Sequence, residues 1–127
     1  MKREKIKIDK KVLKDGIKVK AYKGTIFKAE IGEIMVDKIS TYYQIKFFRV
    51  LEKYRHQGIG SKLLNAVIQE TKESQIIVYP NSEAYEGEKP VDNETLYTIY
   101  EHLGFQFEKK SVDRKRANEK MKLVKKN

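Results

Sequence analysis

The sequence contains no cysteine, which excludes a disulfide framework, a cysteine zinc site and a cysteine nucleophile. Any nucleophile must come from elsewhere, and the substrate is the natural source. Long hydrophobic runs are also missing, since no stretch of about 18 apolar residues is present that would span a membrane. The N-terminal Met-Lys-Arg-Glu-Lys leads into an alternating pattern and not into the apolar core of a signal peptide. We therefore expect a location in the cytoplasm.

The 127 residues are 39% hydrophobic and 36% charged. This composition provides enough apolar material for a core and a heavily charged surface. Chains split into several cores only above about 250 residues. We therefore expect one domain that covers residues 1–127.

The net charge of +10 resides at the two ends of the chain. Residues 1–24 hold ten Lys/Arg against three Asp/Glu, and residues 109–127 hold nine against two, a net +7 at each end. Such basic ends attract nucleic acid or an acidic partner through a long-range field. Alternatively, lysines that alternate along strands protect sheet edges from pairing with other chains.

Alternating apolar and charged residues predict two antiparallel strands at 4–8 and 17–21, with Asp15-Gly16 as the turn. Residues 25–36 and 42–50 are rich in β-branched and aromatic residues, as strands require. The N-terminal half is therefore predicted to be a meander.

Helical periodicity begins after Gly60, with an apolar face of Leu63, Leu64, Val67 and Ile68 and an end near Glu73. A short apolar strand at 75–79 precedes an acidic loop at 81–92.

A second helix follows, with an apolar face of Leu96, Ile99, Tyr100 and Leu103, a cap at Asp92 or Asn93 and a stop at Gly104. Two short strands, at 105–107 and 121–124, close the fold and are joined by the basic stretch 109–120. Helical crossovers require part of the sheet to be parallel. The prediction is an α/β (α+β) fold with a single mixed, mostly antiparallel sheet and two main helices.

The turn from Arg55 to Ser61 joins a strand to the first helix and contains two closely spaced glycines. Gly58 and Gly60 lack the Cβ atoms that would keep a ligand from the backbone, and the first N–H groups of a helix have no intrahelical partner. These donors, the helix dipole and the cation of Arg55 suit a diphosphate. The spacing matches neither the P-loop nor the dinucleotide fingerprint. Without further signals, the same pattern also fits a plain strand-to-helix turn.

This segment resembles the Arg/Gln-x-x-Gly-x-Gly/Ala motif of the GNAT superfamily of N-acetyltransferases, in the residues Arg55-His56-Gln57-Gly58-Ile59-Gly60. A second match downstream consists of Asn93, Tyr100 and Gly104-Phe105. The resemblance covers about residues 42–108, and residues 1–41 carry no family motif.

The resemblance implies that acetyl coenzyme A is the co-substrate and that it wedges between splayed central strands at 45–50 and 75–79, with no metal. The backbone of Phe48 and Val50 would pair with the pantetheine arm, and the amide of Phe48 would stabilise the oxyanion. Tyr100 would be the acid for the leaving thiolate. The cofactor-binding residues would be Phe48, Val50, Arg55, His56, Gln57, Gly58, Ile59, Gly60, Ser61, Asn93 and Tyr100. On their residue types alone, Tyr100 would be a core tyrosine and Asn93 a helix cap.

Two departures from the family pattern concern the base and the acceptor. Gln44 stands where several members carry a glutamate, so the general base stays open among Glu30, Glu33, Asp37, Glu83 and Glu86. The usual N-terminal helix pair that walls the acceptor site is missing. The loop 81–92, with Glu83, Glu86, Glu88 and Tyr85, is the remaining candidate wall, because its acidic rim would attract a cationic amine. The same residues also fit an ordinary solvated loop.

Three functions are compatible with the sequence. The first is N-acetylation of a primary amine on a small molecule or peptide. The second uses an aminoacyl-RNA acceptor, held by the basic ends. The third is a non-catalytic module that binds coenzyme A or nucleic acid. The oligomeric state is left open.

Overall fold

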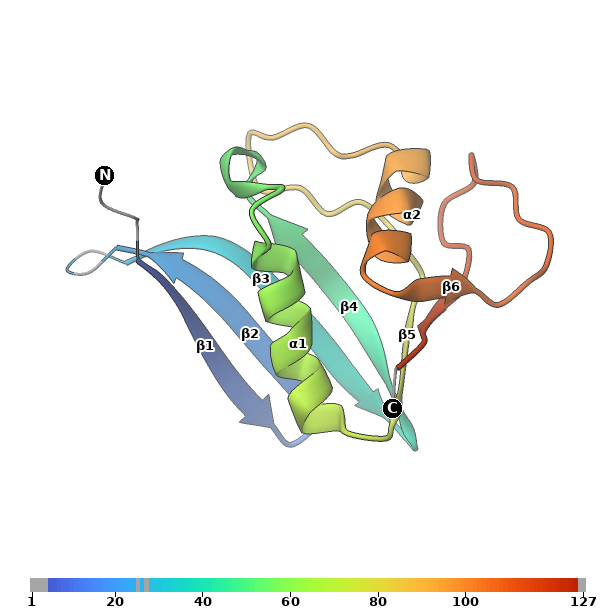
Figure 1. Cartoon of the computed structure of the whole chain (residues 1–127), viewed down its shortest axis with the longest axis horizontal. Helices are drawn as coiled ribbons and strands as arrows, with labels where there is room; N and C mark the ends of the chain where they lie inside the picture. Colours follow the sequence, from blue (N-terminus) through green and yellow to red (C-terminus); the bar gives the residue numbers. More distant parts are fainter. Residues whose placement is uncertain (1–4, 25, 27, 126–127) are drawn as a thin grey trace.

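The computed structural model describes residues 5–24, 26 and 28–125. Seven strands form one sheet in the order β1-β2-β3-β4-β5-β7-β6 (Figure 1). The strands are β1 (Ile6–Leu13), β2 (Gly16–Lys23), β3 (Ala29–Ile39), β4 (Tyr42–Val50), β5 (Gln75–Val78), β6 (Phe105–Phe107) and β7 (Met121–Leu123). Only β4 and β5 pair in parallel, and every other neighbouring pair is antiparallel. The predicted mixed, mostly antiparallel sheet is confirmed.

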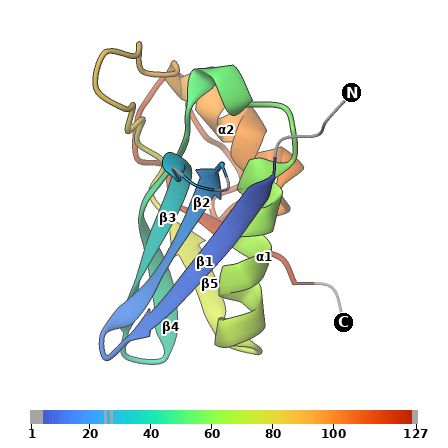
Figure 2. The ribbon, with the colours of Figure 1, turned by 90° about the vertical axis from the view of Figure 1, so that its left-hand side faces the viewer.

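Both α-helices lie on one face of this sheet, as Figure 2 shows edge-on. Helix α1 (Ile59–Thr71) follows a 3₁₀ turn, η1 (Glu52–Tyr54), and packs across β2 and β3. Helix α2 (Asn93–His102) lies next to β6. No helix in the described part of the chain is long and apolar enough to cross a bilayer.

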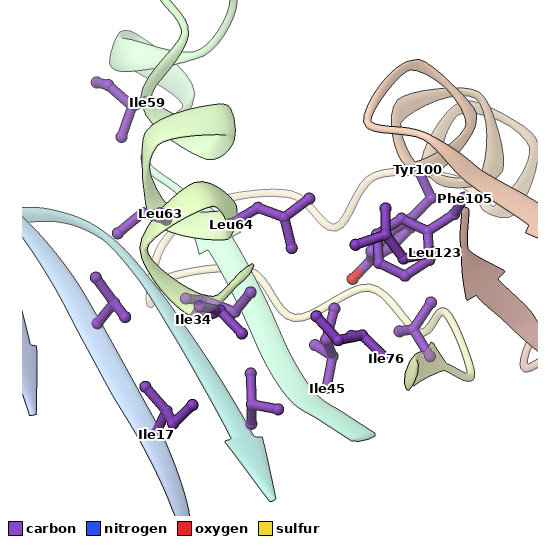
Figure 3. Packing of buried hydrophobic residues seen from close by; sticks show 14 of the residues in the cluster. Ile17, Ile34, Ile45, Ile59, Leu63, Leu64, Ile76, Tyr100, Phe105 and Leu123 are labelled. Atoms are coloured by element: carbon purple, nitrogen blue, oxygen red, sulfur yellow. The ribbon is translucent and has the colours of Figure 1, made fainter. Parts of the chain in front are cut away.

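The main core lies between α1 and the sheet (Figure 3). Leu63, Leu64 and Val67 of α1 are buried against Ile34 and Ile45 of the sheet. The helical spacing in the sequence predicted this face because these positions recur every three to four residues. Each fully buried aliphatic side chain contributes roughly 2 kcal/mol to folding, so this face anchors α1 on the sheet.

The buried face of α2 differs from the sequence prediction in one residue, because Tyr97 takes the place of Ile99. Tyr97 is 1% exposed, whereas Ile99, predicted to face the core, is 37% exposed. Tyr97 packs edge-on against Phe107 at 5.0 Å, and its hydroxyl donates to the carbonyl of Arg116 and accepts from the amide of Glu119. The segment between β6 and β7 therefore covers a second side of α2, which periodicity within the helix does not reveal.

The ends of the first strands also differ from the prediction. Strands β1 and β2 are longer than expected, and their turn is Lys14-Asp15, with Gly16 as the first residue of β2. A Cβ at Gly16 would stand 2.2 Å from the carbonyl oxygen of Val36, so glycine is required by the close approach of β3. Strand β3 begins at Ala29, and of the segment predicted to start at residue 25, positions 25 and 27 lie outside the described residues.

Candidate functional site

Strands β4 and β5 separate halfway along β4. Their parallel pairing runs from Tyr42–Gln75 to Ile45–Val78 and stops there, because β5 ends at Val78 while β4 continues to Val50. In the described chain, the β5-side edge of β4 beyond Ile45 has no strand partner. Figure 1 shows the two strands diverging toward the end of β4 where η1 begins. The predicted splayed central strands are therefore present.

A β-bulge lies at the point where the two strands separate. Ile45 pairs with Val36 and Phe47 pairs with Met35, so Lys46 is the extra residue of β4. Bulges increase local twist and redirect the strand. The bulge thus turns the second half of β4 away from β5.

The alternation of backbone groups aims two amides of β4 at the open edge. The amide of Leu51 donates to the carbonyl of Ile31 on β3 at 2.8 Å. Backbone N–H groups alternate between the two edges of a strand. The amide of Arg49 therefore also points toward β3, and the amides of Phe48 and Val50 point toward the open edge. The carbonyl of Val50 accepts a hydrogen bond from Arg55 Nε at 3.0 Å.

The turn that follows β4 presents a row of backbone donors. Gly58, in the left-handed region at φ 80°, is the N-cap of α1 and provides no side-chain cap. The amide of Lys62 is the first to find an intrahelical acceptor, the carbonyl of Gly58 at 3.1 Å. The amides of Ile59, Gly60 and Ser61 therefore lack intrahelical partners. A Cβ at Gly58 would meet nothing within 4 Å, so the space beside this glycine is open.

The donor row lies beside the open edge of β4. A Cβ at Gly60 would stand 3.5 Å from Cζ of Phe48, an ordinary van der Waals contact. The first turn of α1 therefore rests directly on β4 where the strand has lost its neighbour. An elongated ligand can reach both places at once.

The side chains of the turn play different parts. The guanidinium of Arg55 is engaged with the chain itself, through Val50 and an ion pair of 3.6 Å with Glu88. His56 and Gln57 are exposed, and Nε2 of Gln57 donates to the carbonyl of Lys53 at 3.3 Å. Ile59 is 1% exposed and belongs to the core. Only its amide remains for a ligand.

Tyr100 is a buried residue that packs against Phe48 of β4. The residue is 4% exposed, and its ring packs edge-on against Phe48 and Phe105, with 6.1 Å and 5.2 Å between the ring centroids. Its hydroxyl makes no hydrogen bond within the described residues and points from α2 toward β4 and β5 (Figure 3). Burial raises the pKa of this phenol above its ordinary value. The structure thus places the ring of Tyr100 against Phe48.

Asn93 does not cap α2. The cap of α2 is Asp92, whose carboxylate accepts from the amide of Thr95 at 2.8 Å and whose pKa is lowered by that bond. Asn93 donates through Nδ2 to the carbonyl of Lys115 at 3.0 Å. It therefore helps to hold the basic segment 109–120 on α2.

The opposite face of the sheet carries a charged cluster. Lys20, Glu33 and Arg49 are in register across β2, β3 and β4, on the face away from the buried Val19 and Ile34. Glu33 is 5% exposed, and one of its oxygens accepts from Nε of Arg49 at 2.8 Å and also from Nη2. Sequence reasoning did not single out Arg49. The signal was a charged residue within an aromatic strand, opposite a glutamate on the preceding strand.

Glu30 completes this cluster. Its Oε1 pairs with Lys20 at 2.9 Å, and its Oε2 accepts from the hydroxyl of Tyr85 at 2.8 Å. Burial would raise the pKa of the Glu30 carboxyl, but the bonds from Lys20 and Tyr85 outweigh it and lower the pKa. Of the residues that the sequence offered as a general base, Glu30 and Glu33 thus both already bond to neighbouring side chains.

The loop 79–92 crosses this second face, on the side of the sheet away from the helices (Figure 2). Arg49 lies over the ring of Tyr85 at 4.0 Å and reaches the carbonyl of Ala84 at 3.5 Å. Glu83 and Glu86 are exposed on the loop. Asp37, the remaining candidate base, is in register with Gln44 at the other end of β4. The predicted acidic rim therefore overlies the end of β4 that includes Arg49.

Comparison with known proteins extends these observations. A family model described as acetyltransferase (GNAT) domain matches residues 20–107. A search of curated proteins finds no match.

Several solved structures share the fold. An acetyltransferase of GNAT family from Staphylococcus aureus Mu50 is 19% identical with a TM-score of 0.62, over 85% of this chain and 66% of its own. A putative streptothricin acetyltransferase from Bacillus anthracis, in complex with acetyl coenzyme A, is 22% identical with a TM-score of 0.63, over 88% and 64%. Anti-CRISPR protein AcrVA5 is 23% identical with a TM-score of 0.56, over 74% and 90%. The chain thus spans less than two thirds of the length of the first two, and at these identities the likeness concerns the fold.

Proposed function

Because the chain belongs to the GNAT family of acetyltransferases, we propose that it transfers the acetyl group of acetyl coenzyme A to a primary amine. The observation that carries this proposal is the open edge of β4 beside the uncapped first turn of α1. The first turn of α1 offers backbone donors for a diphosphate, and the open edge of β4 offers amides for an extended arm that ends in a thioester.

The diphosphate binds the amides of the turn 56–61, chiefly those of Ile59, Gly60 and Ser61. Three convergent N–H groups at the positive end of a helix dipole form a favourable anion site. Arg55 braces this turn through the carbonyl of Val50. The pantetheine arm runs along β4 and uses the outward backbone groups of Val50 and Phe48.

Acetyl coenzyme A supplies an activated acetyl thioester at the end of that arm. The amide of Phe48 donates a hydrogen bond to the carbonyl oxygen, which gains negative charge when the neutral amine attacks. A new C–N bond forms, the C–S bond breaks, and the electron pair leaves with the sulfur. The attacking nitrogen loses one proton.

Tyr100 assists the departing sulfur as a hydrogen-bond donor. A thiol has an ordinary pKa of about 8.5 and a phenol of about 10, and burial raises the pKa of Tyr100 further. A phenol that is a weaker acid than the thiol does not give up its proton completely. Tyr100 therefore stabilises the thiolate while remaining protonated.

The proton of the attacking amine passes to solvent water. The carboxylates of Glu30 and Glu33 already accept hydrogen bonds from neighbouring side chains, and Gln44 accepts no proton. Acceptors are cationic amines drawn by the exposed Glu83 and Glu86. They react in their neutral fraction.

The test is an assay of thiol release with a panel of acceptors. Purified protein and acetyl coenzyme A are mixed with a diamine, a polyamine, a lysine-containing peptide or an aminoacyl-RNA. The chain has no cysteine, so the protein itself contributes no background to a thiol reagent. We expect acceptor-dependent release of coenzyme A and a product heavier by one acetyl group. Release at the same rate without any acceptor would contradict the proposal.

A further inference from the structure

Arg55 is the only charged side chain of the turn 55–61 that forms an ion pair within the described residues, and its partner comes from the opposite side of the sheet. Glu88 belongs to the loop 79–92 and lies with Oε1 3.6 Å from Nη2 of Arg55. Its other oxygen, Oε2, accepts from the amide of Glu52 at 3.0 Å. A carboxylate of this loop thus stands against the turn that binds the diphosphate in the proposed function.

The position of this carboxylate is only partly satisfied. Oε1 of Glu88 is buried and has no hydrogen-bond partner in the described structure, and its sole close cation is Arg55. A buried acceptor without a hydrogen bond costs free energy, because it has given up water without replacement. Moving Glu88 into solvent rehydrates Oε1 but gives up the bond from the amide of Glu52 and the ion pair with Arg55, a loss that is reduced when another anion takes its place near Arg55.

The loop that carries Glu88 also rests on the charged cluster of the second face. Tyr85 donates to Glu30 and stacks on Arg49, and the amide of Glu88 donates to the carbonyl of Tyr85 at 3.0 Å. Tyr85 and Glu88 are therefore joined in one turn. A displacement of Glu88 is transmitted to the contacts of Tyr85.

We propose that Glu88 is an internal anion that competes with the diphosphate of the co-substrate for Arg55, so that occupation of the turn releases the loop 79–92 from the second face. The inference rests on the proposed function and adds a residue that sets affinity and the order of binding. Two like charges at one guanidinium repel each other, and a phosphate fits its fork better than a carboxylate at 3.6 Å. The co-substrate therefore binds first, and the amine then reaches the face that the loop has left.

The first measurement is the dissociation constant of acetyl coenzyme A by calorimetry for the wild type, Glu88→Gln and Glu86→Gln. Glu88→Gln removes the competing charge and should bind about tenfold more tightly, as expected for one charge a few ångströms away at the protein surface. Glu86→Gln removes an equal charge from an exposed side chain of the same loop, and should bind within about twofold of the wild type. Equal or weaker binding by Glu88→Gln overturns the inference.

A second pair of variants asks whether the effect acts through Arg55. In an Arg55→Gln background the carboxylate has no cation to contest, so adding Glu88→Gln should change the dissociation constant by less than about twofold. A gain that persists without Arg55 contradicts the competition. Thermal unfolding of all variants separates this result from a loss of folding.

The change in hydrogen exchange of the loop on addition of acetyl coenzyme A is a readout that a purely structural role of Glu88 would not produce. The amides of residues 82–89 should exchange faster in the wild type when acetyl coenzyme A is added, and they should already exchange fast in Glu88→Gln without it. A loop that becomes more protected on binding would overturn the inference. If acetyl coenzyme A binds neither the wild type nor Glu88→Gln, both the proposed function and this inference are wrong. If both proteins bind it with the same affinity, only this inference is wrong.

Discussion

At the scale of single residues, Tyr100 combines a core position with an uncommitted hydroxyl. The ring is buried between Phe48 and Phe105, yet the oxygen has no hydrogen-bond partner in the described chain. A buried tyrosine usually bonds its hydroxyl. The Tyr100 hydroxyl is not one of the fully buried atoms without a partner, so it keeps some accessible surface and is open to a ligand, which fits the proposed role at the leaving sulfur.

Replacing Tyr100 by phenylalanine should therefore leave stability nearly unchanged and reduce turnover. No hydrogen bond of the folded protein is lost, so the free energy of unfolding should change by less than about 1 kcal/mol. Loss of a donor to the leaving sulfur should lower kcat by roughly 10²-fold. Urea unfolding and steady-state kinetics check the two parts, and unchanged kcat would remove Tyr100 from the mechanism.

The pH dependence should rise without a descending limb through the neutral range. The neutral fraction of an alkylamine grows about tenfold per pH unit up to about pH 10.4, which should increase kcat/KM for a subsaturating acceptor. Because burial raises the pKa of Tyr100, its phenol keeps its proton at higher pH than an exposed tyrosine would. A profile that falls between pH 8 and 9 would show that a required acid titrates there and would contradict this assignment.

The residue types indicated which chemical role each side chain can take, but not which residues it contacts. The backbone donors of Gly58 and Gly60 were predictable because glycine spacing and a helix start are local properties. The engagement of Arg55 by Glu88, and of Asn93 by Lys115, was not predictable. Both partners lie in distant loops whose paths depend on the whole sheet.

At the scale of elements, β3 and β4 are joined by an ion pair as well as by their ladder. Glu33 is almost fully buried, while the side chain of Arg49 is 28% exposed. Burial acts to lower the pKa of Arg49, and the bond with Glu33 outweighs it and raises the pKa. The pair fixes the loop 79–92 as well, because Arg49 stacks on Tyr85.

Arg49→Met should destabilise the fold by about 2 kcal/mol, since it leaves the carboxylate of Glu33 buried without its partner, a loss reduced by the partial exposure of the pair. Adding Glu33→Gln should recover part of this loss. Lys120→Met, which breaks the exposed pair with Glu108, serves as the control and should leave the urea midpoint nearly unchanged. An Arg49→Met midpoint equal to that of the control would refute the structural role of the pair.

The helices and strands themselves were largely predictable, because their signals are periodic and local. Strand β4 at 42–50 and the buried face of α1 agree with the sequence prediction. The prediction of the buried face of α2 was wrong at Tyr97 and Ile99, because the segment between β6 and β7 packs against this helix. The bulge at Lys46 arises from pairing with β3 and leaves no pattern within β4 itself.

At the scale of the whole molecule, the two faces of one sheet carry separate tasks. The helical face holds the turn 55–61 and Tyr100, and the other face holds the charged cluster beneath the loop 79–92. The strands separate between these faces, and the loop 79–92 covers the second face near this point through Tyr85 and Arg49. Once this loop is released, as the further inference proposes, a co-substrate and an acceptor can approach from opposite faces.

The central claim is that the uncapped turn at the start of α1 binds the diphosphate of acetyl coenzyme A, and calorimetric titration tests it most directly. The wild type should bind acetyl coenzyme A with a stoichiometry of one, and Gly60→Glu should abolish binding by placing bulk and negative charge at the donor row. Gly60→Ala adds only a Cβ at an ordinary contact distance from Phe48 and should bind within a few-fold of the wild type. Wild-type affinity in a folded Gly60→Glu protein would contradict the account.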